Sequence, residues 1–66
     1  MSLEEIGKLI QEQRSVYGLS SEHLADITGV SVSVIKNIEA GKRNATFSSL
    51  STILDAIGLE LTVVKK

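Results

Sequence analysis

The side chains of this sequence best suited to bind a partner lie close together, between residues 31 and 43. In SVSVIKNIEAGKR the polar residues at helical spacing include Ser33, Lys36 and Asn37, and two adjacent cations follow at Lys42 and Arg43. An asparagine amide both donates and accepts hydrogen bonds, whereas a lysine ammonium only donates them. Lysine and arginine also bind phosphates and other anions. The chemistry that these residues offer is therefore recognition of a partner through hydrogen bonds and charge.

Catalytic and metal-binding chemistry has little support in the same sequence. His23 is the single histidine, cysteine is absent, and no pair of carboxylates lies near an obvious nucleophile. A metal site or an acid–base site needs several such groups together, so His23 is interpreted as a surface residue. We therefore expect no enzyme, no metal and no cofactor. The lack of cysteine also excludes a disulfide framework and favours a reducing cytoplasm as the location.

The polar residues must be positioned by residues 20–41, which contain two short helical patterns separated by three residues. In the first pattern Ser20 can cap a helix and Gly29 can end it. Its apolar residues Leu24, Ala25 and Ile27 share one face. Two helices joined by so short a turn predict a helix-turn-helix.

The second pattern predicts a helix capped by Ser31 and ended by Gly41. Its inward stripe consists of Val34, Ile35 and Ile38. Its outer face, which would meet a partner, consists of Val32, Ser33, Lys36 and Asn37.

Helices are also expected on both sides of this motif. Apolar residues at spacings of three and four predict an amphipathic helix over residues 3–17. Gly7 interrupts it, which indicates either the close approach of another backbone or simple tolerance near the helix start, and we favour tolerance. A fourth helix is expected between Thr46 as its cap and Gly58 as its end. The two aromatic residues, Tyr17 and Phe47, are assigned to the core.

The tail LELTVV changes from a helical to an alternating pattern, with Leu59, Leu61 and Val63 on one side. Alternation of this kind predicts a strand. A single strand leaves its backbone hydrogen-bonding groups unpaired, and the sequence predicts no second strand. We therefore expect the tail to pair with the same strand of a second copy, which makes the chain a homodimer. Residues 1–58 would then form one helical domain, and residues 59–66 a dimerisation strand.

GLSSEHLADITGVSVSVIKNIEAGKRN resembles the Xre-type (phage-repressor-like) helix-turn-helix family, and within it the small antitoxin-like members with a C-terminal strand. The residues that match the family pattern are Gly18, Leu19, Ser20, Leu24, Ala25, Gly29, Val30, Ser31, Ile35, Ile38, Glu39, Gly41 and Arg43. The resemblance implies an all-α, compact four-helix domain whose short C-terminal β-strand pairs across a dimer. It also implies a structural salt bridge between Arg14 and Glu39, which would fix the angle between the first and third helices.

The function implied by the resemblance is binding of double-stranded DNA at a palindromic operator by a transcriptional repressor, plausibly an autoregulating antitoxin. Phosphates would be held by Ser20 or Ser21 and by helix N-termini, with added charge from Lys42 and Arg43. Base edges would be met by Val32, Ser33, Lys36 and Asn37. Asn37 could bond adenine through two atoms, whereas Val32 offers only a methyl surface to thymine.

The net charge of −1 gives no general attraction to nucleic acid, so binding must depend on where the cations lie. Two residues also depart from the family pattern: Ser21 stands in place of the usual glutamine, and Val32 in place of a residue that is often polar. The alternative is therefore a protein-interaction module of the same fold that binds a toxin or other protein without strong DNA readout. No apolar run is long enough for a membrane span, and the N-terminus lacks the positive charge of a signal peptide.

Overall fold

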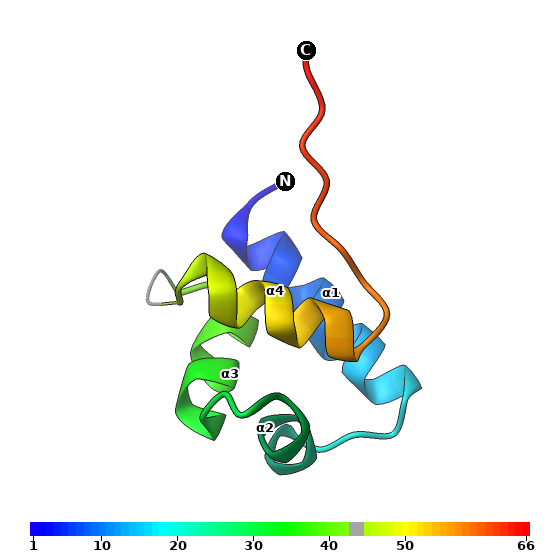
Figure 1. Cartoon of the computed structure of the whole chain (residues 1–66), viewed down its shortest axis with the longest axis vertical. Helices are drawn as coiled ribbons and strands as arrows, with labels where there is room; N and C mark the ends of the chain where they lie inside the picture. The colour runs from blue at the N-terminus through cyan, green and yellow to red at the C-terminus, as the bar shows by residue number, and fades with distance from the viewer. Residues whose placement is uncertain (43–44) are drawn as a thin grey trace.

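A computed structural model of the chain describes residues 1–42 and 45–66, and in them it contains four helices and no strand (Figure 1). The helices are α1 (Leu3–Val16), α2 (Ser21–Thr28), α3 (Val32–Glu39) and α4 (Phe47–Ala56). In Figure 1, α2 lies at one end of the long axis of the molecule, and both termini lie toward the other. The predicted all-α, four-helix fold is confirmed.

Each helix begins at a serine or threonine whose hydroxyl oxygen accepts a hydrogen bond from the backbone N–H three residues later. The predicted caps Ser20, Ser31 and Thr46 all do so. Ser2 caps α1 in the same way, and its own N–H donates to the Glu5 carboxylate at 2.9 Å. This bond is the main reason why the pKa of Glu5 lies below its ordinary value. Each cap of this kind is worth about 1 kcal/mol of helix stability.

The core contains apolar side chains from all four helices and from the residue that ends α4. Its buried members are Ile10, Leu24, Ile35, Ile38, Ile53, Leu54 and Ile57. Burying one such side chain contributes about 1.5–3 kcal/mol before the loss of chain entropy is counted. So few buried side chains leave a domain of this size only marginally stable by itself.

Both aromatic residues lie at the surface, so their assignment to the core was wrong. Tyr17 is 55% exposed and Phe47 is 73% exposed. Tyr17 follows the last residue of α1, and its hydroxyl lies over Gly58, where an added Cβ would stand 2.8 Å from it. Phe47 is the first residue of α4 and lines a surface hollow together with the tail residues Leu59 and Leu61.

Gly7 is buried because another backbone crosses α1 there. A Cβ placed on Gly7 would overlap the carbonyl oxygen of Ile38 and would stand 2.7 Å from that of Glu39. The preference for simple tolerance was therefore wrong, and close backbone approach is the physical reason for the glycine. The end of α3 rests on α1 at the one position of that helix that has no side chain.

The C-terminal tail (residues 59–66) leaves the helices and forms no strand within the single chain (Figure 1). Its first residue is anchored, because the Leu59 N–H donates to the Leu54 carbonyl at 2.9 Å and its side chain packs against the core. The strand expected over this tail is absent from the single chain because a strand needs a hydrogen-bonded neighbour, and the described residues contain none. Its pairing with a second copy stays a prediction.

Candidate functional site

The turn between α2 and α3 is held by local hydrogen bonds. Gly29 ends α2 with φ 74°, the left-handed conformation that glycine adopts without strain. Its N–H donates to the Ala25 carbonyl. The Thr28 hydroxyl donates to the Leu24 carbonyl at 2.7 Å and accepts from the Val30 N–H at 3.2 Å. These bonds orient α3 relative to α2.

The outer face of α3 presents two exposed polar side chains, Ser33 and Lys36. Val32 and Asn37 flank them and are partly buried, so Asn37 faces outward less completely than its position in the pattern indicated. Ala40, one turn beyond Lys36, is exposed on the same stripe and was not among the residues predicted for it. Its spacing of four from Lys36 was the available signal. The stripe can offer hydrogen bonds, one positive charge and a methyl group.

The residues after α3 are fixed to the helix. The Gly41 N–H donates to the Ile38 carbonyl at 3.0 Å, and the Lys42 N–H donates to the Asn37 carbonyl at 2.9 Å. This pair of bonds is a Schellman motif, which needs the left-handed conformation that Gly41 adopts at φ 79°. Lys42 was predicted to lie in a polar loop, and the structure shows its backbone tied to the end of α3. Arg43, the other predicted cation, lies outside the described residues.

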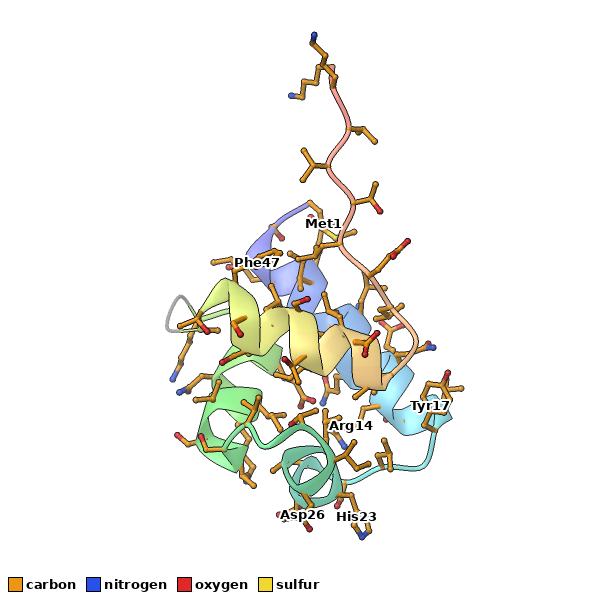
Figure 2. The ribbon with its side chains drawn as sticks, viewed as in Figure 1. Met1, Arg14, Tyr17, His23, Asp26 and Phe47 are labelled. Carbon is orange, nitrogen blue, oxygen red and sulfur yellow. The ribbon has the colours of Figure 1, made fainter. Side chains whose placement is uncertain are left out.

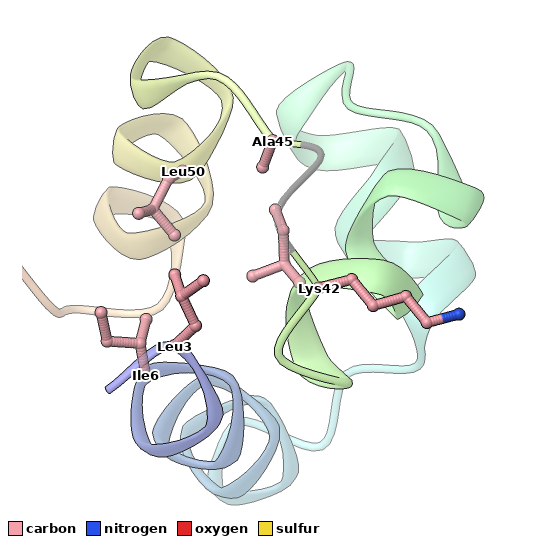
Figure 3. Close-up of a pocket in the computed structure, with 6 residues that line it drawn as sticks. Leu3, Ile6, Lys42, Ala45 and Leu50 are labelled. Atoms are coloured by element: carbon pink, nitrogen blue, oxygen red, sulfur yellow. The ribbon is translucent and has the colours of Figure 1, made fainter. Parts of the chain in front are cut away.

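A pocket of about 180 Å³ lies beside Lys42 (Figure 3). It is lined by Leu3, Ile6, Ile38, Lys42, Ala45 and Leu50. Lys42 contributes the stem of its side chain, and its ammonium group points away from Leu3, Ile6 and Leu50 (Figure 3). The charge of Lys42 is therefore presented to solvent, where it can reach an anion.

The predicted phosphate-binding serines lie at the start of α2. The Ser20 hydroxyl oxygen accepts from the His23 N–H at 3.1 Å, and both Ser20 and Ser21 are partly buried. A helix N-terminus favours anions because its first N–H groups point outward. Glu22, in the first turn, is exposed and would oppose an anion there. The start of α2 is thus a weaker anion site than its backbone alone would make it.

An ion pair joins α1 to the last residue of α3. Arg14 Nε lies 2.8 Å from Glu39 Oε2, and Nη2 lies 3.1 Å from Oε1, so the guanidinium donates a hydrogen bond to each carboxylate oxygen. The remaining nitrogen, Nη1, donates to the Leu19 carbonyl at 2.8 Å. The side chains are only 16% and 10% exposed, and the hydrogen bond to Glu39 is the main reason why the pKa of Arg14 is raised. This arrangement fixes the position of α3 on α1.

His23 and Asp26 point outward from α2, and Arg14 points into the molecule (Figure 2). Among residues 1–42 and 45–66, no group of three or more metal-ligating side chains is close enough to hold an ion. None of the described helices is long and apolar enough to cross a membrane.

Comparison with known proteins agrees with this geometry. A family model described as helix-turn-helix matches residues 10–64. No curated protein matches the chain. The crystal structure of the restriction-modification controller protein C.AhdI from Aeromonas hydrophila is similar, with a TM-score of 0.78 and 31% sequence identity over 88% of each chain. The region that the family model matches contains α2, α3 and α4, and therefore the whole outer face of α3.

Proposed function

Because the chain belongs to the Xre-type helix-turn-helix family, we propose that it is a sequence-specific DNA-binding transcriptional regulator that reads double-stranded DNA with α3. The observation that carries the proposal is the exposure of Ser33 and Lys36 on a helix whose other face is held by the core and by the Arg14–Glu39 pair. A rigidly held helix with a polar outer face suits readout in the major groove.

In the proposed complex, phosphate contacts set the position of the protein, and base contacts set its specificity. Lys42 supplies charge beside the end of α3, and Ser20 and Ser21 supply hydroxyl groups at the start of α2. Arg43 would add a second cation next to Lys42. The base edges are read by Val32, Ser33, Lys36 and Asn37, with Asn37 as the residue able to recognise adenine.

We further propose that the regulator acts in the cytoplasm as a homodimeric repressor on a palindromic operator, with the C-terminal tails paired as strands through Leu59, Leu61 and Val63. Two-fold symmetry in the protein suits two half-sites in the DNA. The similarity to a restriction-modification controller protein supports a regulatory role. An autoregulating antitoxin is the form that the sequence resemblance favours, and a toxin gene beside this one would be the expected genetic context.

The proposal is tested by binding to duplexes from upstream of the gene that encodes the chain, measured over a range of salt concentrations. The logarithm of the binding constant should fall linearly with the logarithm of the salt concentration, because neutralised phosphates release counterions. Asn37→Ala should cost about 1–3 kcal/mol on the operator and leave non-specific binding unchanged.

Gln11→Ala, an exposed substitution on α1, is the matched control and should change neither quantity. Thermal unfolding of both variants shows whether a change in DNA binding reflects a loss of stability. The DNA-reading proposal is rejected if duplex binding is absent, or if Asn37→Ala keeps the affinity and discrimination of the unsubstituted protein.

The second candidate function is binding of a protein through the same fold, and one observation favours it. Ile27, near the end of α2, is 61% exposed. Two acidic residues of the same helix, Glu22 and the neighbouring Asp26, are also exposed. A surface of this composition suits a protein better than a phosphate backbone. If Ile27→Ala weakens a protein partner and leaves duplex binding intact, α2 serves that partner while α3 serves DNA.

A further inference from the structure

The tail runs from the end of α4 toward the end of the molecule away from α2 (Figure 1), and exposed apolar side chains lie beside it. Met1 is 83% exposed, and Leu9 and Leu61 are each 43% exposed. They border a hollow of about 110 Å³, here called the apolar hollow. It is lined by Met1, Ile6, Leu9, Leu54, Leu59, Glu60 and Leu61. One lining residue is charged, so the hollow favours an apolar occupant.

Within the described residues, no side chain of the same chain fills the apolar hollow. The remaining apolar residues of the tail, Val63 and Val64, are 97% and 79% exposed. Covering such a side chain with another apolar surface would stabilise it. The tail therefore carries both the edge of the hollow, at Leu59 and Leu61, and a side chain that the hollow could accept.

The strand-paired homodimer proposed above determines which residue of a second copy reaches the hollow. In an antiparallel ribbon, two residues that lie opposite each other point to the same face, and side chains alternate between the faces along each strand. A two-fold axis perpendicular to the ribbon keeps each residue on the same face in both copies. The residue opposite Leu59 must therefore also be odd-numbered. A register centred on Leu61 places Val63 there and pairs all three alternating apolar residues with one another. A register centred on residue 62 would instead place Lys65 opposite Leu59, and one centred on residue 60 would leave Val63 without a strand partner.

Charge supports the same register. With Leu61 at the centre, the two C-terminal lysines of the second copy lie alongside the end of α4. Asp55 and Glu60 line a second hollow beside the apolar one, and the carbonyl groups at the end of α4 add partial negative charge. Positive charge on Lys65 and Lys66 would thus meet a negative surface.

We propose that Val63 of a second copy fills the apolar hollow, packed against Leu9 and Met1, and that this contact joins the strand ribbon to α1. The inference rests on the homodimer proposed above. It adds a contact between the tail of one copy and the first helix of the other, which pairing of the tails alone would not require. Val64 points to the opposite face of the ribbon and serves as the matched control.

The natural chain contains no cysteine, so introduced thiols can report these contacts without interference. Leu61→Cys should form a disulfide-linked homodimer under mild oxidation, because the ribbon places residue 61 opposite itself. Leu9→Cys mixed with Val63→Cys should form a linked heterodimer at least fivefold more abundant than Leu9→Cys mixed with Val64→Cys. Disulfides require Cβ atoms within about 4.5 Å, so the comparison distinguishes the two faces.

Sedimentation equilibrium provides an independent measurement in solution. Val63→Asp should raise the dimer dissociation constant at least tenfold, whereas Val64→Asp should change it less than threefold. Circular dichroism should show the same helix content in both variants, because both side chains are exposed and neither belongs to the core of its own chain.

The outcomes distinguish the contact of Val63 with α1 from the strand-paired homodimer on which it rests. If Leu61→Cys forms linked dimers but the Val63 and Val64 variants behave alike, the ribbon stands and the contact with α1 is wrong. If the unsubstituted chain remains monomeric at high concentration, the homodimer is wrong and the inference fails with it.

Discussion

The guanidinium of Arg14 bonds two other parts of the chain, the carboxylate of Glu39 and the carbonyl of Leu19. A lysine at this position could not form the two parallel bonds to the carboxylate, so Arg14→Lys should destabilise the fold. In a double-mutant cycle, Arg14 and Glu39 should couple by more than about 1 kcal/mol, above the roughly 0.2–1 kcal/mol of exposed pairs. Urea denaturation of the four proteins measures this coupling.

Glu4 and Lys8 are the matched control, because both are exposed and stand four residues apart on the same helix. A cycle on this control pair should give about 0.3–0.5 kcal/mol. Equal coupling in the two cycles would mean that the bonds seen for Arg14 add nothing beyond an ordinary surface pair.

Lys42 is expected to contribute affinity without specificity. Its ammonium group faces solvent beside the end of α3, and its backbone is fixed by the bond to Asn37, so it presents a charge at a defined place. Lys42→Ala should weaken all duplexes to a similar extent and make the salt dependence shallower by about 1. Lys8→Ala, on the exposed face of α1, should leave the slope unchanged. A loss confined to one base pair of the operator would instead make Lys42 a base reader.

At the scale of the elements, the seating of α3 on α1 depends on Gly7. Glycine to alanine inside a helix ordinarily stabilises it by about 1 kcal/mol. Here the added methyl group would overlap the carbonyl groups of Ile38 and Glu39, so Gly7→Ala should lower the melting temperature instead. Gln11→Ala, exposed on the same helix, should change stability by no more than about 0.5 kcal/mol. An increase in melting temperature with Gly7→Ala would show that α3 can move aside without cost.

The helix ends could be predicted from the sequence because capping is a local property. Ser20, Ser31 and Thr46 accept bonds from N–H groups three residues away, and no knowledge of packing is needed to expect them. The reason for Gly7 could not be predicted in this way, because it depends on which backbone crosses α1. The positions of Tyr17 and Phe47 were mispredicted because an aromatic residue at the end of a helix can lie at the surface even when its type favours the core.

The candidate site was predicted as one face of a helix, and its detail depends on tertiary packing. Ser33 and Lys36 are exposed, as the helical spacing indicates, but Asn37 is partly buried at the edge of the stripe. The Schellman motif that fixes Lys42 could have been inferred from Gly41, which follows the helix directly. Which bases these residues contact stays a prediction.

For the whole molecule, the tail is expected to determine the association state. Leu59 packs against the core, so a truncation should keep it and remove only residues 60–66. The shortened chain should remain helical but sediment as a monomer, because the remaining helices keep their contacts while the strand is lost. A stable dimer after this truncation would place the interface on another surface. The same variant should bind an operator half-site with little change and the full palindrome much more weakly.

α1 makes contacts on two opposite faces, and the proposed dimer would use them to couple the two ends of the molecule. Gly7 and Arg14 hold one face against α3, while Leu9 on the other face borders the apolar hollow. A shift of α1 caused by an occupant of the hollow would therefore move the helix proposed to read DNA. Linkage of this kind is reciprocal: whatever factor dimerisation adds to operator affinity, operator DNA must add to the affinity of the two copies for each other. Occupancy of the operator would then rise more steeply than in proportion to protein concentration, and the chain would respond to its own abundance as a threshold.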